Sequence, residues 1–181
     1  NLKEVESKID GVYQIPSEAF RDKTTLIKCV LPDKLERIED WAFSRTSLTG
    51  TVQLPEGLKY VSGFDETKIT NVQFPSTLEE IGNNAFSSCK SLMCEISLPN
   101  SLKRIGDLAF YNSVIKGNLA LPEGLEYIGS SAFSGCSGLT GSLTIPSGVH
   151  IINSYAFLSC GFTGNLTLPM GLTEIQENAF C

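Results

Sequence analysis

Residue columns that recur along this chain of 181 residues restrict its fold more strongly than any other feature. Seven of the eight prolines follow one another at steps of 20 to 24 residues, and aliphatic residues stand three and six positions after each of them. Eight of the ten phenylalanines recur with a similar step: Phe20, Phe43, Phe64, Phe86, Phe110, Phe133, Phe157 and Phe180. A unit of this length cannot bury its apolar face alone, so tandem units that stack into a solenoid are expected.

Each unit contains two extended segments and one tight turn. The residues before each proline alternate between apolar and polar, as in Val52-Gln53-Leu54, which is typical of a short strand with one buried face. Consecutive strands of this kind are expected to pair in parallel. The L-x-x-I segment after the proline is a second extended segment that faces the core from the other side. The A-F-x-x-C segment is expected to form a helical or 3₁₀ turn that places its phenylalanine in the core.

The repeat also predicts how the chain is divided. Residues 1–14 match the unit only in part, and we expect them to be a degenerate first repeat or an N-terminal cap. Residues 15–181 hold about seven to eight tandem repeats of 20–24 residues. The chain stops in the middle of a unit at Cys181, so we expect the array to be truncated at its C-terminus.

The charge of the chain narrows the classes of partner. A net charge of −6 and a pI of about 4.8 disfavour nucleic acid and anionic membrane surfaces. No apolar run approaches the roughly 20 residues that a membrane-spanning helix needs, so we expect no membrane insertion by this segment. The sequence leaves the oligomeric state open.

Side chains that carry chemistry are few and scattered. Cys89, Cys136 and Cys160 each lie three residues after a repeat phenylalanine, and we expect a buried ladder of free thiols there, because parallel Cβ directions oppose a disulfide. The six cysteines include no C-x₂-C pair, so no metal site is expected, and no cofactor either. The single histidine, His150, has no nucleophile and base arranged around it and is expected to be a solvated surface residue. We therefore expect no enzyme.

Two carboxylate pairs, Asp65-Glu66 and Glu79-Glu80, belong to the third unit, which is short and lacks the Ala-Phe pair. Two interpretations are open. The pairs are either the solvated charged edge of an irregular repeat, which we favour, or a local kink or acidic patch used for recognition.

The segment from Leu125 to Pro146, LEYIGSSAFSGCSGLTGSLTIP, closely resembles the BspA-like leucine-rich repeat family, also called the Treponema type. The resemblance extends from about Val12 to the end of the chain. It implies a leucine-rich-repeat solenoid, a right-handed superhelix of short parallel strands. It also implies an extracellular or cell-surface location and a role in adhesion or in binding host extracellular proteins. The chain departs from the family pattern in its third unit and in units that lack the cysteine.

Solenoid curvature gives such proteins a broad concave surface that usually binds the partner. We expect the outward positions of the pre-proline strands to form two rows on that surface, although these rows lack the Trp, Tyr and Arg residues that dominate tight interfaces. The nominated residues are Thr51, Gln53, Asn71, Gln73, Glu95, Ser97, Asn118, Ser142, Thr144, Asn165 and Thr167.

The sequence thus favours a non-catalytic module that binds a protein partner, as part of a secreted or cell-surface bacterial protein. Two alternatives remain open. One is a structural spacer that displays another domain, and the other is a surface or intracellular leucine-rich-repeat protein of a protist.

Overall fold

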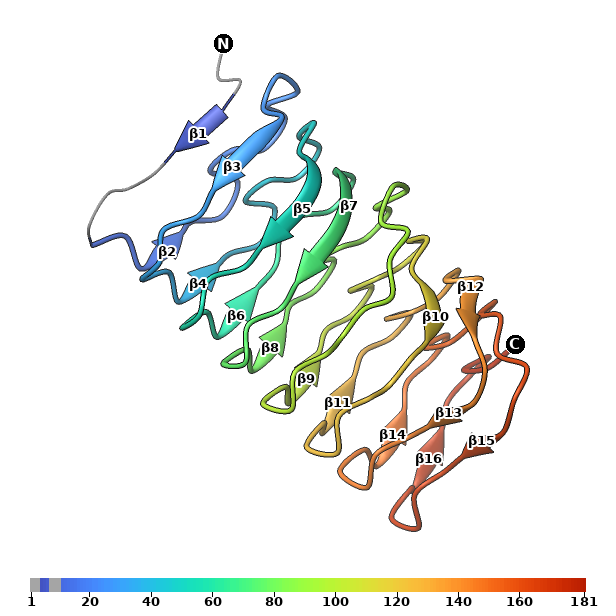
Figure 1. The fold of residues 1–181 in the computed structure, drawn as a ribbon. Helices are drawn as coiled ribbons and strands as arrows, with labels where there is room; N and C mark the ends of the chain where they lie inside the picture. Colours follow the sequence, from blue (N-terminus) through green and yellow to red (C-terminus); the bar gives the residue numbers. More distant parts are fainter. Residues whose placement is uncertain (1–3, 7–10) are drawn as a thin grey trace.

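The chain forms a solenoid of stacked coils in which every strand pair is parallel among the residues that the structure describes (Figure 1). The structure is a computed structural model, and it describes residues 4–6 and 11–181. We number the coils 1 to 8 by the repeat phenylalanine that each contains, from Phe20 in coil 1 to Phe180 in coil 8. The predicted solenoid of short parallel strands is confirmed.

The strands form two series on two sides of the stack (Figure 1). One series ends on the aliphatic residue of the L-x-x-I segment, and we call it the aliphatic-strand side. It contains β2 (Gln14–Ile15), β4 (Arg37–Ile38), β6 (Tyr60–Val61), β8 (Glu80–Ile81), β9 (Arg104–Ile105), β11 (Tyr127–Ile128), β14 (Ile151–Ile152) and β16 (Glu174–Ile175). The other series precedes the prolines, and we call it the pre-proline side. It contains β3 (Lys28–Val30), β5 (Thr49–Gln53), β7 (Lys68–Gln73), β10 (Lys116–Asn118), β12 (Gly138–Thr140), β13 (Leu143–Thr144) and β15 (Leu166–Thr167), and β1 (Glu4–Glu6) pairs with β3.

The aliphatic-strand side carries the longest sheet, with six strands in the order β2-β4-β6-β8-β9-β11. In coils 2 to 6 the residue after the aliphatic one donates its N–H to the aliphatic carbonyl of the preceding coil, as from Glu39 to Ile15 at 3.0 Å. Coil 1 has Pro16 at this position, which has no N–H to donate. In coil 7 the side-chain amide of Asn153 bonds Ile128 O instead, at 2.6 Å, and the sheet breaks between β11 and β14.

The pre-proline ladder is less continuous than the alternation in the sequence predicts, because it consists of separate two-stranded pairs. Residues Met93–Leu98 of coil 4 form no strand. Cys94 occupies the position five residues before the repeat proline, where Gly50, Gly117 and Gly141 of other coils have φ values of 78°, 85° and 78°. Cys94 is not at positive φ, so the backbone of coil 4 follows another path here than in those three coils.

The predicted helical or 3₁₀ turn around each phenylalanine is wrong, since none of the described residues is helical. Alternate N–H groups of the turn donate a hydrogen bond to the carbonyl oxygen three residues earlier, as from Ala42 to Glu39 O and from Ser44 to Trp41 O. The N–H groups between them bond the next coil, as from Phe43 to Gly63 O at 2.8 Å. A helix would direct all these donors along one coil. The alternating pattern places residues such as Trp41 at positive φ (57°) and ties each turn to its neighbour.

The phenylalanines form one stack through the whole core. Neighbouring rings lie 5.0 to 5.7 Å apart between centroids, with planes within 17° of parallel. The six rings from Phe43 to Phe157 are at most 1% exposed. Offset stacking at this distance is a favourable arrangement for aromatic rings, and large apolar area is removed from water at each step.

Coil 3 is the irregular unit that the sequence indicates. It has two fewer residues than coil 4 between its aliphatic residue and its phenylalanine, since Val61-Ser62-Gly63-Phe64 replaces Ile81-Gly-Asn-Asn-Ala-Phe86. Gly63 spans the shortened corner with φ 78°, and a Cβ on it would lie 2.4 Å from Ala42 N. The alanine typical of the repeat therefore does not fit at this position.

We predict that Phe110→Ala lowers the free energy of unfolding by about 3–5 kcal/mol, because it leaves a cavity between two stacked rings. Urea unfolding followed by circular dichroism measures the change. Phe180→Ala is the matched control, since this ring stacks on a repeat phenylalanine at one side only. A loss as large for Phe180 as for Phe110 would show that the stack is not the source of stability.

We predict that Gly63→Ala destabilises the chain by about 2–4 kcal/mol, through positive φ and a backbone clash together. Gly57→Ala is the control, because Gly57 has φ 101° but a Cβ added to it would meet no atom within 4 Å, and it is expected to lose only about 1–2 kcal/mol. Thermal unfolding of both variants tests the order. Equal losses would mean that the close packing of Gly63 does not matter.

Candidate interaction surfaces

The nominated polar residues lie on the pre-proline side, and ten of the eleven are exposed, while Asn71 is half-buried. Parallel pairing brings some of them opposite one another: Thr51 beside Asn71, Gln53 beside Gln73, and Thr144 beside Thr167. Neighbours in a parallel sheet are about 4.8 Å apart, so these side chains form short polar rows. That the rows bind a partner stays a prediction.

The rows are not continuous along the stack. Asn118 pairs with Thr140 and not with Ser142, because two residues of coil 6 separate β12 from β13. Glu95 and Ser97 are exposed but lie in the part of coil 4 that forms no strand. Ser142 Oγ accepts a hydrogen bond from Asn165 N at 3.0 Å, so part of this polar surface is already used between coils.

The aliphatic-strand side displays side chains that the sequence interpretation missed. The residue before each repeat aliphatic residue points outward from the six-stranded sheet, and in coils 2 to 6 these residues are Arg37, Tyr60, Glu80, Arg104 and Tyr127. Both arginine side chains are 40% exposed or more. Arginine and tyrosine are the residue types that dominate protein interfaces. The sequence does show these residues, since they all stand one position before the repeat aliphatic residue.

Two arginines stack on tyrosines of the following coil in the same way. The Arg37 guanidinium lies 4.2 Å from the Tyr60 ring centroid, and Tyr60 Oη donates to Asp40 Oδ1 at 2.9 Å. Arg104 and Tyr127 repeat the arrangement three coils later, at 3.7 Å. Burial, followed by the hydrogen bond to Asp40, raises the pKa of Tyr60. These contacts hold the side chains in place across coils.

The cysteine ladder has a hydrogen-bonding role. Cys89, Cys136 and Cys160 each donate from Sγ to the carbonyl of the repeat phenylalanine in the preceding coil, at 3.0 to 3.2 Å. Ser113 does the same in coil 5, to Phe86 O. All six cysteines are unpaired. Burial raises the pKa of Cys89 and of Cys160 to about 12, so these thiols are poor nucleophiles.

Asp65 differs from the favoured interpretation of its carboxylate pair, since it is only 8% exposed whereas Glu66 is exposed. Asp65 Oδ2 accepts a hydrogen bond from Ser44 Oγ at 2.7 Å, and Oδ1 is buried with no partner among the described residues. Burial raises the pKa of this carboxyl group. The interpretation of Asp65 as part of a solvated charged edge is therefore wrong.

His150 is exposed, as expected, and its Nδ1 lies 2.9 Å from Gly171 O. Within residues 4–6 and 11–181, no three His, Cys, Asp or Glu side chains come close enough to hold a metal ion. The same described part of the chain has no helix long and apolar enough to span a membrane.

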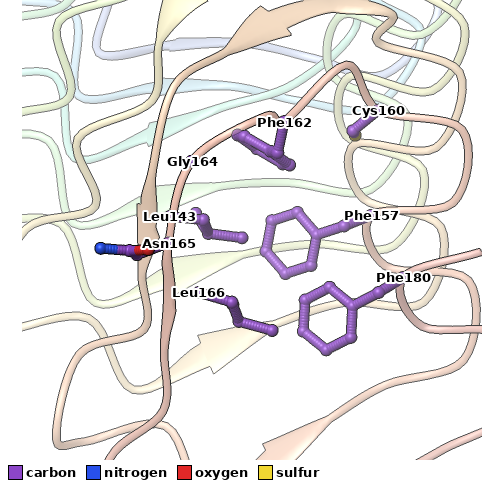
Figure 2. A pocket seen from close by; sticks show the side chains of 8 residues that line it. All are labelled: Leu143, Phe157, Cys160, Phe162, Gly164, Asn165, Leu166 and Phe180. Atoms are coloured by element: carbon purple, nitrogen blue, oxygen red, sulfur yellow. The ribbon is translucent and has the colours of Figure 1, made fainter.

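A hollow of about 190 Å³ is lined by residues of coils 6, 7 and 8. Figure 2 shows the side chains of Leu143, Phe157, Leu166 and Phe180 facing one another around it, while Asn165 points away. The lining is apolar apart from backbone groups, the Cys160 thiol and Asn165. It therefore lacks the converging polar groups that orient a small ligand.

The chain is similar to a known repeat family and to solved structures of other leucine-rich repeat proteins. The family BspA type Leucine rich repeat region matches residues 13–116 and 61–181, in six copies. No curated protein matches the chain. A leucine-rich repeat protein from Bacteroides ovatus is 24% identical, with a TM-score of 0.60 over 96% of this chain and 47% of that one. The T. pallidum leucine-rich repeat protein is 27% identical, with a TM-score of 0.58 over 95% and 72%. The chain spans about half the length of the first of these proteins.

We predict that iodoacetamide at pH 8 modifies Cys181 first, because it is exposed, and Cys89 and Cys160 only after unfolding. A pKa of about 12 in place of 9.0 reduces the thiolate fraction about a thousandfold. Peptide mass spectrometry over time gives the order, and labelling in urea provides the control. Rapid native labelling of Cys89 would contradict the buried hydrogen-bonded ladder.

Proposed function

The chain belongs to the BspA-type leucine-rich repeat family, and on that premise we propose that it is a protein-interaction module without catalytic activity. The observation that carries the proposal is the presence of exposed polar side chains in parallel register on the pre-proline strands. Repeat proteins bind partners through such extended surfaces, in which each coil adds one contact at a fixed spacing.

The partner that we propose is a host extracellular protein, and the location is outside the cell or on its surface, in a secreted or anchored bacterial protein. The family resemblance supports this location. The acidic net charge of −6 supports a protein partner over nucleic acid.

The alternative that merits the same test is a spacer that extends another domain. The row residues are Thr, Ser, Asn, Gln and one Glu, and none of them is a Trp, Tyr or Arg of the kind that dominates binding hot spots. A spacer needs only the stack itself, so its surface residues tolerate replacement.

We predict that charge-bearing substitutions in the rows weaken binding by about tenfold or more without changing the unfolding temperature. Gln53→Lys with Gln73→Lys tests one paired position, and Thr144→Lys with Thr167→Lys tests another. Biolayer interferometry against immobilised plasma and extracellular-matrix proteins measures binding. The control is Asp33→Lys with Glu123→Lys, at residues outside the strands.

Loss of binding in the row variants but not in the control supports the module. Equal loss in the control would show that total charge and not the rows is responsible. Unchanged binding in every variant would reject the rows as the contact surface, and no binding by the unsubstituted chain would favour the spacer.

A further inference from the structure

The phenylalanine turn of coil 3 is joined to each neighbouring coil by fewer backbone hydrogen bonds than the other turns are. At the other five junctions between neighbouring turns, three N–H groups of one coil donate to carbonyls of the next coil. Where coil 5 meets coil 6, the donors are Leu108, Phe110 and Asn112. Only two N–H groups donate at each junction of coil 3 in the described chain, namely Phe43 and Arg45 from coil 2, and Phe64 and Glu66 from coil 3. The shortened corner therefore leaves coil 3 with the two weakest junctions of the turn side.

The shortened corner also removes a hydrogen bond within coil 3. In the seven other coils, the residue after the repeat phenylalanine donates its N–H to the carbonyl three residues earlier, as from Ser44 to Trp41 O at 3.1 Å. In coil 3 this residue is Asp65, and its N–H makes no such bond in the part of the chain that the structure describes. Asp65 thus stands at the position where the repeated bonding pattern fails.

The side chain of Asp65 replaces a small neutral one. The same position holds a buried serine in coils 2, 4 and 6, namely Ser44, Ser87 and Ser134. Asp65 lies between the serines of coils 2 and 4 and is 8% exposed. Ser44 Oγ donates to its Oδ2 at 2.7 Å, whereas Oδ1 is buried without a hydrogen-bond partner among the described residues. A buried carboxylate oxygen without a partner is costly when it is charged.

The charged groups near Asp65 do not compensate a negative charge there. No Lys or Arg side chain forms an ion pair with Asp65 within residues 4–6 and 11–181. Arg45 of coil 2 acts on Asp65 only through space, since its guanidinium bonds Asp22 of coil 1 at 2.6 and 2.9 Å. Glu66 adds a second negative charge beside it. From coil 4, the nearby thiol of Cys89 stays neutral, because burial raises its pKa to about 12.

Burial raises the pKa of the Asp65 carboxyl group, against the hydrogen bond from Ser44, which lowers it. The folded chain therefore holds this proton more tightly than the unfolded chain does. The resulting stability is fully present below the ordinary pKa of an aspartate, and it is lost as the pH rises through the higher pKa of the folded chain. Above that pH, the buried charge favours any opening that lets water reach Oδ1.

We propose that coil 3 is a proton-sensitive weak point of the stack, closed when Asp65 is neutral and loosened when Asp65 is ionised. Ionisation draws water to Oδ1, and the two junctions with only two turn hydrogen bonds open first. Because each coil contacts only its neighbours, this opening loosens the connection between coils 1–2 and coils 4–8. The device goes beyond the proposed function and does not depend on any partner.

Amide hydrogen exchange measured by mass spectrometry tests the proposal in the whole chain. The unsubstituted chain and Asp65→Asn are compared at equal pH, from about pH 4 to about pH 8, so that the intrinsic pH dependence of exchange cancels. In the turns of coils 2 to 4, we expect the unsubstituted chain to exchange faster than the variant, with a ratio that grows about tenfold over this range. The turns of coils 6 and 7, which have three bonds at their junction, are the internal control and should show no such change.

Two further variants separate the buried carboxyl group from general charge. Asp65→Ser copies Ser44 and Ser87 and is expected to behave like Asp65→Asn. Glu66→Gln removes the exposed neighbouring carboxylate and is expected to keep most of the pH dependence of the unsubstituted chain. The unfolding temperature of each variant as a function of pH gives a second measurement of the same difference.

Three results would overturn the proposal: an exchange ratio that does not change with pH, an equal change in coils 6 and 7, or a complete loss of pH dependence in Glu66→Gln. Circular dichroism shows whether the Asp65 variants keep the fold. If they do not, a carbon-13 titration of the aspartate carboxyl groups in the unsubstituted chain decides. A carboxyl group that titrates above the ordinary range of aspartate supports the proposal, and its absence would reject it.

Discussion

No coil of this chain can remove its own phenylalanine from water. Each ring from Phe43 to Phe157 is covered by the ring of the coil before it and the ring of the coil after it, about one strand spacing away. The backbone also links neighbouring coils, because alternate N–H groups of the phenylalanine turns donate hydrogen bonds to carbonyls of the next coil. Stability therefore belongs to the interfaces between coils, and the surface of each coil is left free to vary.

This separation explains which features the sequence could reveal. Residues that face the core must be apolar at the same position of every coil. Phe110 and Ile105 therefore stand in columns of similar residues that are visible without a structure. Turn conformation was not visible, because a phenylalanine turn of alternating bonds and a 3₁₀ turn require the same apolar residues. The break in the pre-proline strands in coil 4 was not visible either, because Glu95-Ile96-Ser97-Leu98 alternates like the segments that do form strands.

The candidate surfaces were predictable only in part. Thr144 and Thr167 were found because an alternating strand exposes every second residue, and the structure places them side by side. Arg37 and Tyr60 were missed because a two-residue strand shows no alternation of its own. The 42% exposure of Trp41 was not predictable, because the burial of a corner side chain depends on how the neighbouring coils pack.

Pro16 gives coil 1 a different edge from the later coils. Every later coil up to coil 6 offers an N–H at this position to the coil before it, and Pro16 offers none. An exposed sheet edge can recruit the edge of another molecule, and a proline on that edge removes one of the bonds that recruitment requires. Pro16, the one proline outside the repeat columns, therefore makes the β2 edge a poorer partner for an added strand than the edges of the later strands of this sheet would be.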